Sequence, residues 1–361
     1  MSLIINLKAY FLRKLTYKNS VNFDIKDASS VLFMRYDRIG DMIISTPVFR
    51  ELKLAYPKIT ISVLASKTNS AVLINNPYVD NVIVNRKYFL ANLKSLILLR
   101  KINFDVCIEF DHSVVPHAII RLKIIKPKLV ISVFKDGRYG VTGSELKLYD
   151  IFTENKKNTH LCENWLATLQ PFGIFAKSTI YDLPYSAAQD FRAIFFLNKY
   201  DGKFLIGINL EGAVSGKKIE FNELEELCRR LYNFYSNIQI IVLAEPKKYL
   251  YIDNQIKKMN LNYACISYLT NSIMDVAALI DNLDLIITPD TSVVHIASAY
   301  NKPVVSIHES NRDSYEKFAP KSKINRTVFS NSIKSLEGFS LDLLISYSIE
   351  LIKALREKRH N

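Results

Sequence analysis

The segment from Arg35 to Asp41 concentrates charge in one short turn, with side chains from Arg35, Asp37, Arg38 and Asp41. An apolar run precedes it and an amphipathic run follows, which predicts a strand, a turn containing Gly40 and a helix starting at Asp41. A carboxylate at a helix start often only caps free backbone N–H groups. A cap does not need this density of charge, and ligands of open α/β sheets bind at the carboxyl ends of strands. The segment is therefore a candidate ligand site.

A second junction, Thr288–His295, also leads from an apolar strand into a helix. The free N–H groups and positive dipole end of that helix form a seat for a phosphate. The hydroxyls of Thr291 and Ser292 can donate to a ligand, and Asp290 can accept from sugar hydroxyls. His295 lies one helical turn beyond Thr291, although a lone histidine in such a run is more often a core residue. The junction favours a phosphorylated sugar or nucleotide.

Between these junctions, the loop at 211–218 reads EGAVSGKK and directly follows an apolar strand. Small residues together with lysine suggest a phosphate-binding loop. It is not a P-loop, because only three residues separate Gly212 from Gly216 and Lys218 stands where a P-loop has its magnesium-binding Ser or Thr. The chain also has no GxGxxG motif, which disfavours a classical dinucleotide enzyme.

Other catalytic and metal-binding patterns are missing from the sequence. The six histidines and four cysteines show no HExxH motif, CxxC pair or comparable ligand spacing, so we predict no metal site. No GxSxG elbow occurs, which removes the most common hydrolase interpretation. Scattered cysteines also fit a reducing compartment.

Two series of alternating strands and helices must position the candidates. In the first half we predict strands at 31–36, 59–65, 79–84, 104–110 and 128–134, and helices near 41–55, 68–75, 88–101, 113–124 and 160–174. In the second half we predict strands at 203–210, 238–244, 263–269, 284–290 and 303–308, and helices near 221–235, 247–259, 272–281 and 292–300. Strands separated by helices predict parallel sheets covered on both faces. Residues 135–160 lose the alternation and are predicted to form a mobile loop.

The length of 361 residues is too great for one ordinary core and predicts two domains. An apolar content of 49% with 23% charged residues is typical of a globular enzyme. We expect an N-terminal Rossmann-like domain at 21–175, a linker at 176–202, a C-terminal Rossmann-like domain at 203–340 and a helix at 341–361 that could pack back on the first domain.

The pattern of residues 1–20 predicts a basic amphipathic helix. This helix either packs on the first domain or lies against anionic lipid. The net charge of +13 favours anionic partners, although part of the lysine surplus could be compositional. No segment reaches the ~20 apolar residues of a membrane-spanning helix, and the N-terminus lacks a cleavage site. We therefore expect a cytoplasmic protein, either free or peripheral on the inner face of the cytoplasmic membrane.

Two longer runs resemble the signature segments of glycosyltransferase family 9, the ADP-heptose:lipopolysaccharide heptosyltransferases. They are RYDRIGDMIISTPVFRELKLAYP at 35–57 and DLIITPDTSVVHIASAYNKPVV at 284–305, within a similarity from about residue 30 to about residue 310. The resemblance implies an α/β protein of the GT-B fold, in which two Rossmann-like domains face each other across a cleft. It also implies an inverting, metal-independent transferase without a cofactor, whose acceptor binds the N-terminal half and whose nucleotide-sugar donor binds the C-terminal half.

By position, Asp41 matches the catalytic aspartate of the family and Lys217 its phosphate-contacting lysine. Chemistry agrees, because displacement at an anomeric carbon needs a base for the acceptor proton, and the leaving diphosphate needs positive groups that replace a metal. We predict that Arg35, Asp37 and Arg38 bind the acceptor. The predicted donor site consists of Gly40, Gly212, Ala213, Ser215, Lys217, Glu245, Asn271, Asp290, Thr291, Ser292 and His295.

The resemblance implies transfer of heptose from ADP-heptose to the inner core of lipopolysaccharide or lipooligosaccharide. Three departures leave another nucleotide-sugar open as donor: Ser292 replaces a usual glycine, Ile219 a usual aromatic residue, and His308–Arg312 a usual glycine-rich stretch. One alternative is a GT-B epimerase of nucleotide-sugars. The other is a non-enzymatic basic module, but the sequence lacks the aromatic and basic interleaving of a nucleic-acid surface, so we expect no nucleic-acid partner.

Overall fold

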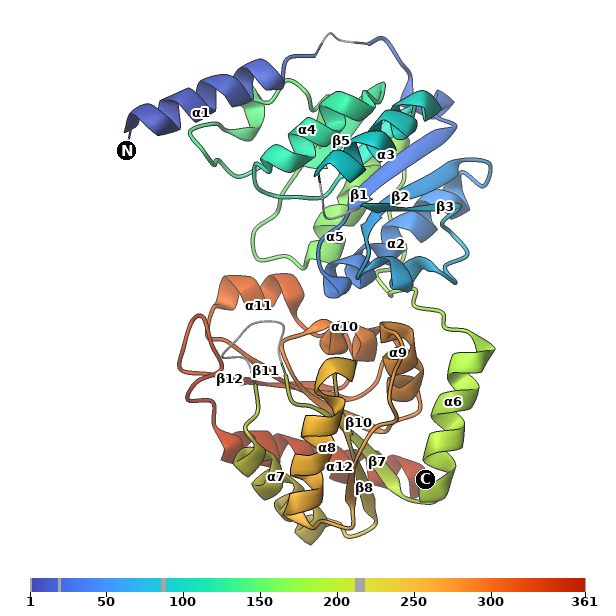
Figure 1. Ribbon diagram of the computed structural model, residues 1–361, viewed down its shortest axis with the longest axis vertical. Helices are drawn as coiled ribbons and strands as arrows, with labels where there is room; N and C mark the ends of the chain where they lie inside the picture. Colours follow the sequence, from blue (N-terminus) through green and yellow to red (C-terminus); the bar gives the residue numbers. More distant parts are fainter. Residues whose placement is uncertain (1, 19–20, 86–88, 212–217, 361) are drawn as a thin grey trace. The chain divides into compact units, whose positions relative to one another are not determined.

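The computed structural model describes residues 2–18, 21–85, 89–211 and 218–360, and it divides the chain into two compact units, Met1–Asp182 and Leu183–Asn361 (Figure 1). Each unit contains one six-stranded sheet in which all strand pairs are parallel. All ten strands predicted from the sequence are present. The predicted class, an α/β protein with two Rossmann-like sheets, is therefore confirmed.

The sheet of the first unit has the strand order β3-β2-β1-β4-β5-β6. Its strands are β1 (Ser30–Arg35), β2 (Thr60–Ser66), β3 (Asn81–Asn85), β4 (Val106–Glu109), β5 (Leu129–Val133) and β6 (Ile151–Thr153). The helices are α1 (Ser2–Leu15), α2 (Ile39–Ala55), α3 (Phe89–Ile102), α4 (Pro116–Ile125) and α5 (Leu161–Leu166). The order reverses at β1, which lies between β2 and β4.

Alternate residues of β1 point to opposite faces of this sheet, and both faces are covered by helices. Leu32 and Met34 belong to a buried cluster with residues of α1, α3 and α4. Phe33 instead contacts Phe49 of α2, with ring centroids 4.8 Å apart, and α2 packs against α5. A strand buried on both faces explains the continuous apolar run at residues 31–34.

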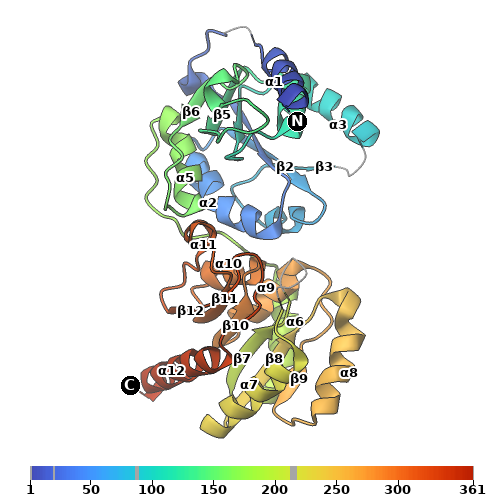
Figure 2. The ribbon, with the colours of Figure 1, turned by 90° about the vertical axis from the view of Figure 1, so that its left-hand side faces the viewer.

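The sheet of the second unit has the order β12-β11-β10-β7-β8-β9. Its strands are β7 (Phe204–Asn209), β8 (Ile238–Leu243), β9 (Ala264–Ile266), β10 (Leu285–Pro289), β11 (Val304–His308) and β12 (Asn325–Phe329). The helices are α6 (Ala187–Leu197), α7 (Phe221–Phe234), α8 (Tyr249–Met259), α9 (Ile273–Asp281), α10 (Ser292–Ala299), α11 (Arg312–Phe318) and α12 (Leu341–His360) (Figure 2). Here the order reverses at β7.

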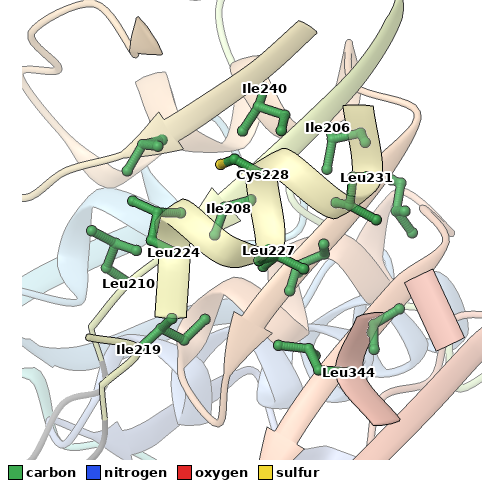
Figure 3. Close-up of a cluster of buried hydrophobic side chains, with 14 of the residues drawn as sticks. Ile206, Ile208, Leu210, Ile219, Leu224, Leu227, Cys228, Leu231, Ile240 and Leu344 are labelled. Atoms are coloured by element: carbon green, nitrogen blue, oxygen red, sulfur yellow. The ribbon is translucent and has the colours of Figure 1, made fainter. Parts of the chain in front are cut away.

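The helix α7 shows how the apolar pattern of a helix builds this core (Figure 3). Leu224, Leu227 and Leu231 are fully buried at helical spacing, and they belong to the same cluster as Ile206 of β7. Burial of each such side chain contributes about 1.5–3 kcal/mol. Leu344 of α12 joins the cluster from the C-terminal end of the chain.

Four details differ from the expectations. Residues 135–160 contain β6, a three-residue edge strand too short to show a pattern. The strand β12 and the helix α11 were not predicted at all. The helix α6 lies inside the expected linker 176–202, yet it packs on α9 of the second unit. The structure assigns α12 to the second unit, where it packs on α7 and on β10–β12, so the sequence-based possibility that residues 341–361 pack back on the first domain does not hold.

Candidate active site

The carboxyl end of β1 is the point of the first unit where the strand order reverses, which is the usual ligand position in such sheets. Arg35 ends β1, and α2 begins at Ile39 with Arg38 as its N-cap. Asp41 therefore lies in the first turn of α2. Gly40 is a buried residue of this turn rather than part of the preceding connection, so the helix starts earlier than expected.

Arg35 connects the charged groups of this site. Its guanidinium lies 2.9 Å from Asp41 Oδ1, 3.0 Å from Asp37 Oδ2 and 3.8 Å from Asp111 Oδ1. Its other contact is with Trp165 of α5, whose ring centroid is 4.3 Å from Arg35 Cζ. Burial alone would lower the pKa of Arg35, but the carboxylates, Asp41 first among them, outweigh it and raise that pKa. The guanidinium thus stays charged and holds Asp41 in place.

The structure does not use Asp41 as a helix cap. The N-cap Arg38 makes no side-chain cap hydrogen bond, and the Asp41 carboxylate pairs with the guanidinium of Arg35. The Asp41 side chain keeps 13% of its surface exposed, so a ligand can reach it. An oriented carboxylate with solvent access can accept a proton from a bound hydroxyl.

Three charged residues next to this site were missed in the sequence. Glu109 ends β4, Asp111 follows it, and Lys135 follows β5. Lys135 and Glu109 form an ion pair in which both side chains are buried, and Lys135 Nζ also contacts the Asp111 carbonyl and the Ser132 hydroxyl. In the sequence these residues show only as charged residues that follow apolar strands. Their place next to Asp41 depends on β4 lying beside β1, which only the strand order reveals.

The carboxyl of Asp111 should make the stability of the first unit depend on pH. Burial, together with the charge of Glu109, raises the pKa of Asp111 to about 9. An unfolded aspartate titrates near pH ~4. Between pH ~4 and 9, the Asp111 carboxyl is therefore protonated in the folded state and ionised in the unfolded state. Its contribution to the free energy of unfolding is fully present below pH ~4 and is lost as the pH rises toward 9.

We expect Asp111→Asn to flatten the decline in unfolding free energy between pH ~5 and ~9, because an amide has no proton to lose. Urea unfolding at a series of pH values measures this slope. Asp27→Asn, at an exposed position of the same unit, is the matched control and should keep the wild-type slope. A slope unaltered by Asp111→Asn would show that this carboxyl is ionised in the folded protein.

The second candidate site lies where β7 and β10 are neighbours in the second unit. Thr291 is the N-cap of α10, and its hydroxyl accepts a hydrogen bond of 3.1 Å from the Val293 N–H. Asn209, which ends β7, donates from Nδ2 to the hydroxyl oxygens of Thr288 at 3.0 Å and Thr291 at 3.2 Å. This cross-link fixes the start of α10 relative to β7. Asn209 was also missed in the sequence.

The groups around the start of α10 differ in their access to a ligand. Asp290 and Ser292 are both half-buried, and the first turn of α10 carries no acidic residue that would cancel its positive end. His308, which ends β11, is buried with Nδ1 3.8 Å from Asp290 Oδ1. His295 is 3% exposed and lies near the ring of Phe318. Such burial is typical of a core histidine, so contact of His295 with the donor stays a prediction.

The remaining donor candidates lie near the ends of β8 and β9 or outside the described residues. Glu245 follows β8 closely and is exposed. Asn271 lies just before Ser272, the N-cap of α9, and its backbone N–H donates to Asp275 Oδ2 at 2.8 Å. The candidates Gly212, Ala213, Ser215 and Lys217 lie outside the described residues. Within the part of the chain that the structure describes, no three His, Cys, Asp or Glu residues are grouped to hold a metal ion.

The sequence model of the protein family described as "Glycosyltransferase family 9 (heptosyltransferase)" matches residues 98–339, which are more than half of the chain. The chain belongs to glycosyltransferase family 9. A relative, the putative lipopolysaccharide heptosyltransferase 4 of Escherichia coli (strain K12), is 24% identical over 305 residues, covering 82% of this chain and 80% of the relative. Family membership makes the protein a glycosyltransferase and sets aside the alternative of a non-enzymatic basic module.

Solved structures of a family 9 glycosyl transferase and of a heptosyltransferase share the fold. The family 9 glycosyl transferase of Veillonella parvula DSM 2008 superposes with a TM-score of 0.75 at 17% identity, covering 93% of this chain and all 100% of that one. The E. coli heptosyltransferase WaaC with ADP superposes with a TM-score of 0.68 at 16% identity, covering 89% of this chain and 99% of that one. The fold is therefore GT-B. The family match begins at residue 98, so the role of Asp41 rests on its geometry.

Proposed function

We propose that this family 9 member transfers heptose from ADP-heptose to the inner core of lipopolysaccharide or lipooligosaccharide. The observation that carries the proposal is the Asp41 carboxylate, held by a buried arginine at the reversal point of the first sheet. The names of the relatives support the substrates, because one is a putative lipopolysaccharide heptosyltransferase and another holds ADP. The cytoplasm is the proposed compartment, since all four cysteines are free thiols.

In the proposed reaction, the acceptor hydroxyl gives its proton to Asp41 as its oxygen bonds to the anomeric carbon of the donor. The bond from that carbon to the nucleoside diphosphate breaks at the same time, so a single displacement inverts the configuration. The leaving diphosphate gains negative charge. Backbone N–H groups at the start of α10 stabilise this charge, and Lys217 has the same role in the proposal.

The role of one of the three predicted acceptor-binding residues, Arg35, needs to change. Arg35 is 4% exposed and engaged with carboxylates and Trp165, so it is a poor candidate for direct contact with a sugar acceptor. We propose that Arg35 acts through Asp41 as a positioning residue. Asp37 and Arg38 are exposed beside it, and Arg38 suits the phosphate or carboxylate groups of an inner-core acceptor.

A thermal-shift screen of nucleotide-sugars tests the donor. ADP-heptose should raise the melting temperature most, because a ligand at about 100 times its Kd raises the free energy of unfolding by about 2.7 kcal/mol.

Asp290→Asn should weaken donor binding by about 10-fold to 100-fold, since it removes a charged acceptor of sugar hydroxyls. Asp253→Asn, on α8 of the same unit, is the control and should bind like the wild type. Equal affinity in both variants would remove Asp290 from the donor site.

Product analysis separates transfer from epimerisation. With donor and a truncated inner-core acceptor, the proposal predicts a glycosylated acceptor and free ADP in equal amounts. With donor alone it predicts no new sugar epimer. Formation of an epimer without acceptor would instead identify the enzyme as an epimerase.

A further inference from the structure

One face of the helix α1 packs on the first unit, and the opposite face exposes large apolar and tyrosine side chains. Ala9 and Leu12 are buried in the core of the unit. Arg13 fixes the helix through Glu145 Oε1 at 2.7 Å and the Gly140 carbonyl at 3.0 Å. The outward side chains are Leu7, Tyr10, Phe11 and Leu15, each at least 42% exposed. A helix that served only to cover the core would carry polar side chains on its outer face.

The helix α3 repeats this arrangement. Leu96 and Leu99 are buried in the same core, whereas Ile97, Leu98 and Ile102 are each at least 46% exposed. Lys94 and Lys101 are exposed among them at helical spacing. The outer face of α3 is thus also apolar and basic.

These two helices belong to one surface, because α4 packs against both α1 and α3 (Figure 1). None of the three helices carries Asp or Glu, and six of their eight Lys or Arg residues are exposed: Lys8, Arg13, Lys14, Lys94, Arg100 and Lys101. Helices of the second unit differ, since α7 and α8 mix both signs of charge in pairs such as Arg229 with Glu225 and Lys257 with Asp253. We call the outer face of α1, α4 and α3 the basic helix layer.

We propose that the basic helix layer docks on the surface of an anionic lipid bilayer. Apolar and tyrosine side chains enter the headgroup region, and the lysines beside them pair with anionic lipid. A second copy of the chain is a poor occupant, because it would bring an identical face of excess positive charge against a chain of net charge +13. No described helix is long and apolar enough to cross a membrane, so the contact is interfacial. The inference does not depend on the donor sugar.

Co-sedimentation of the full chain with vesicles tests the proposal. Vesicles of phosphatidylcholine with about 30% phosphatidylglycerol should bind the protein, and pure phosphatidylcholine vesicles should bind at least about tenfold less. Salt at about 0.5 M should release most of the protein from the anionic vesicles. Binding that is equal on both vesicles would overturn the role of charge.

Two variants locate the surface. Phe11→Gln with Leu98→Gln changes exposed residues of the basic helix layer and should reduce vesicle binding about tenfold. The matched control is Phe191→Gln with Phe195→Gln, which alters two exposed, stacked rings on α6 of the second unit and should bind like the wild type. Equal loss in both variants, or no loss in the first, would refute the assignment. A dimer that the first variant dissociates in solution would make the layer a protein interface and also refute it.

Discussion

Asp41→Asn should lower kcat by about 10²-fold to 10⁴-fold, which is the usual contribution of a general base. The amide has the same shape and can still accept a hydrogen bond from Arg35, but it cannot take up the proton of the acceptor hydroxyl. Donor affinity should be nearly unchanged, because all proposed donor groups except Gly40 belong to the second unit. Steady-state kinetics with an inner-core acceptor give kcat, and thermal shift with ADP-heptose gives donor binding.

Asp37→Asn is the informative control for this experiment. Asp37 belongs to the same turn and also pairs with Arg35, at 3.0 Å, yet its side chain is 39% exposed and it is not the proposed base. Its loss should affect KM for the acceptor more than kcat. If Asp37→Asn abolished turnover while Asp41→Asn kept wild-type kcat, the base would be Asp37 and the proposed geometry of the reaction would be wrong.

Arg35→Met separates positioning from acceptor contact. Without the guanidinium, Asp41 loses the group that orients its carboxylate at 2.9 Å, so kcat should fall by about 10-fold to 100-fold while KM for the acceptor changes little. Steady-state kinetics measure both, and a residue that only held the acceptor would raise KM and leave kcat near its wild-type value.

The sequence was informative wherever the signal was local. Each of the ten predicted strands is a short apolar run, and the two junctions after β1 and β10 stand out because charged or hydroxyl residues follow such runs directly. Local patterns also predicted a basic amphipathic helix at 1–20, and the structure has the helix α1 at Ser2–Leu15. They could not show which face packs inward, because Leu7 and Leu12 have the same chemistry and only tertiary contacts bury one and expose the other.

The missed residues depend on contacts between distant segments. Glu109 and Lys135 are 26 positions apart and meet because β4 and β5 are adjacent strands. Asn209 reaches Thr291 across 82 positions because β7 pairs with β10. No periodicity within either segment encodes such a pairing. Alternation of strands and helices predicts a parallel sheet but leaves the strand order open, and the strand order is what assembles both sites.

Lys135→Met should destabilise the first unit by about 3–5 kcal/mol, the usual cost of removing one partner from a buried ion pair. Both side chains of the Lys135–Glu109 pair are buried, so the methionine would leave the Glu109 carboxylate without its cation in a medium that solvates charge poorly. Charge pairing with Lys135 also contributes to the lowered pKa of Glu109. The expected loss therefore grows as the pH rises and Glu109 must stay ionised. Urea unfolding of the variant measures it.

The double variant Lys135→Met with Glu109→Gln decides whether the charge itself is the cause. Without a carboxylate to leave unpaired, the double variant should recover most of the lost stability. The glutamine Oε1 can still accept a hydrogen bond from the Asp111 N–H, and its Nε2 can donate to the Ser132 hydroxyl oxygen. Lys257→Met, which breaks an exposed pair on α8, should change stability little. A double variant as unstable as Lys135→Met would point to packing of the lysine stem against Tyr149 instead. A stable double variant with low kcat would show that the buried pair serves Asp41 through Asp111 and Arg35 rather than the fold.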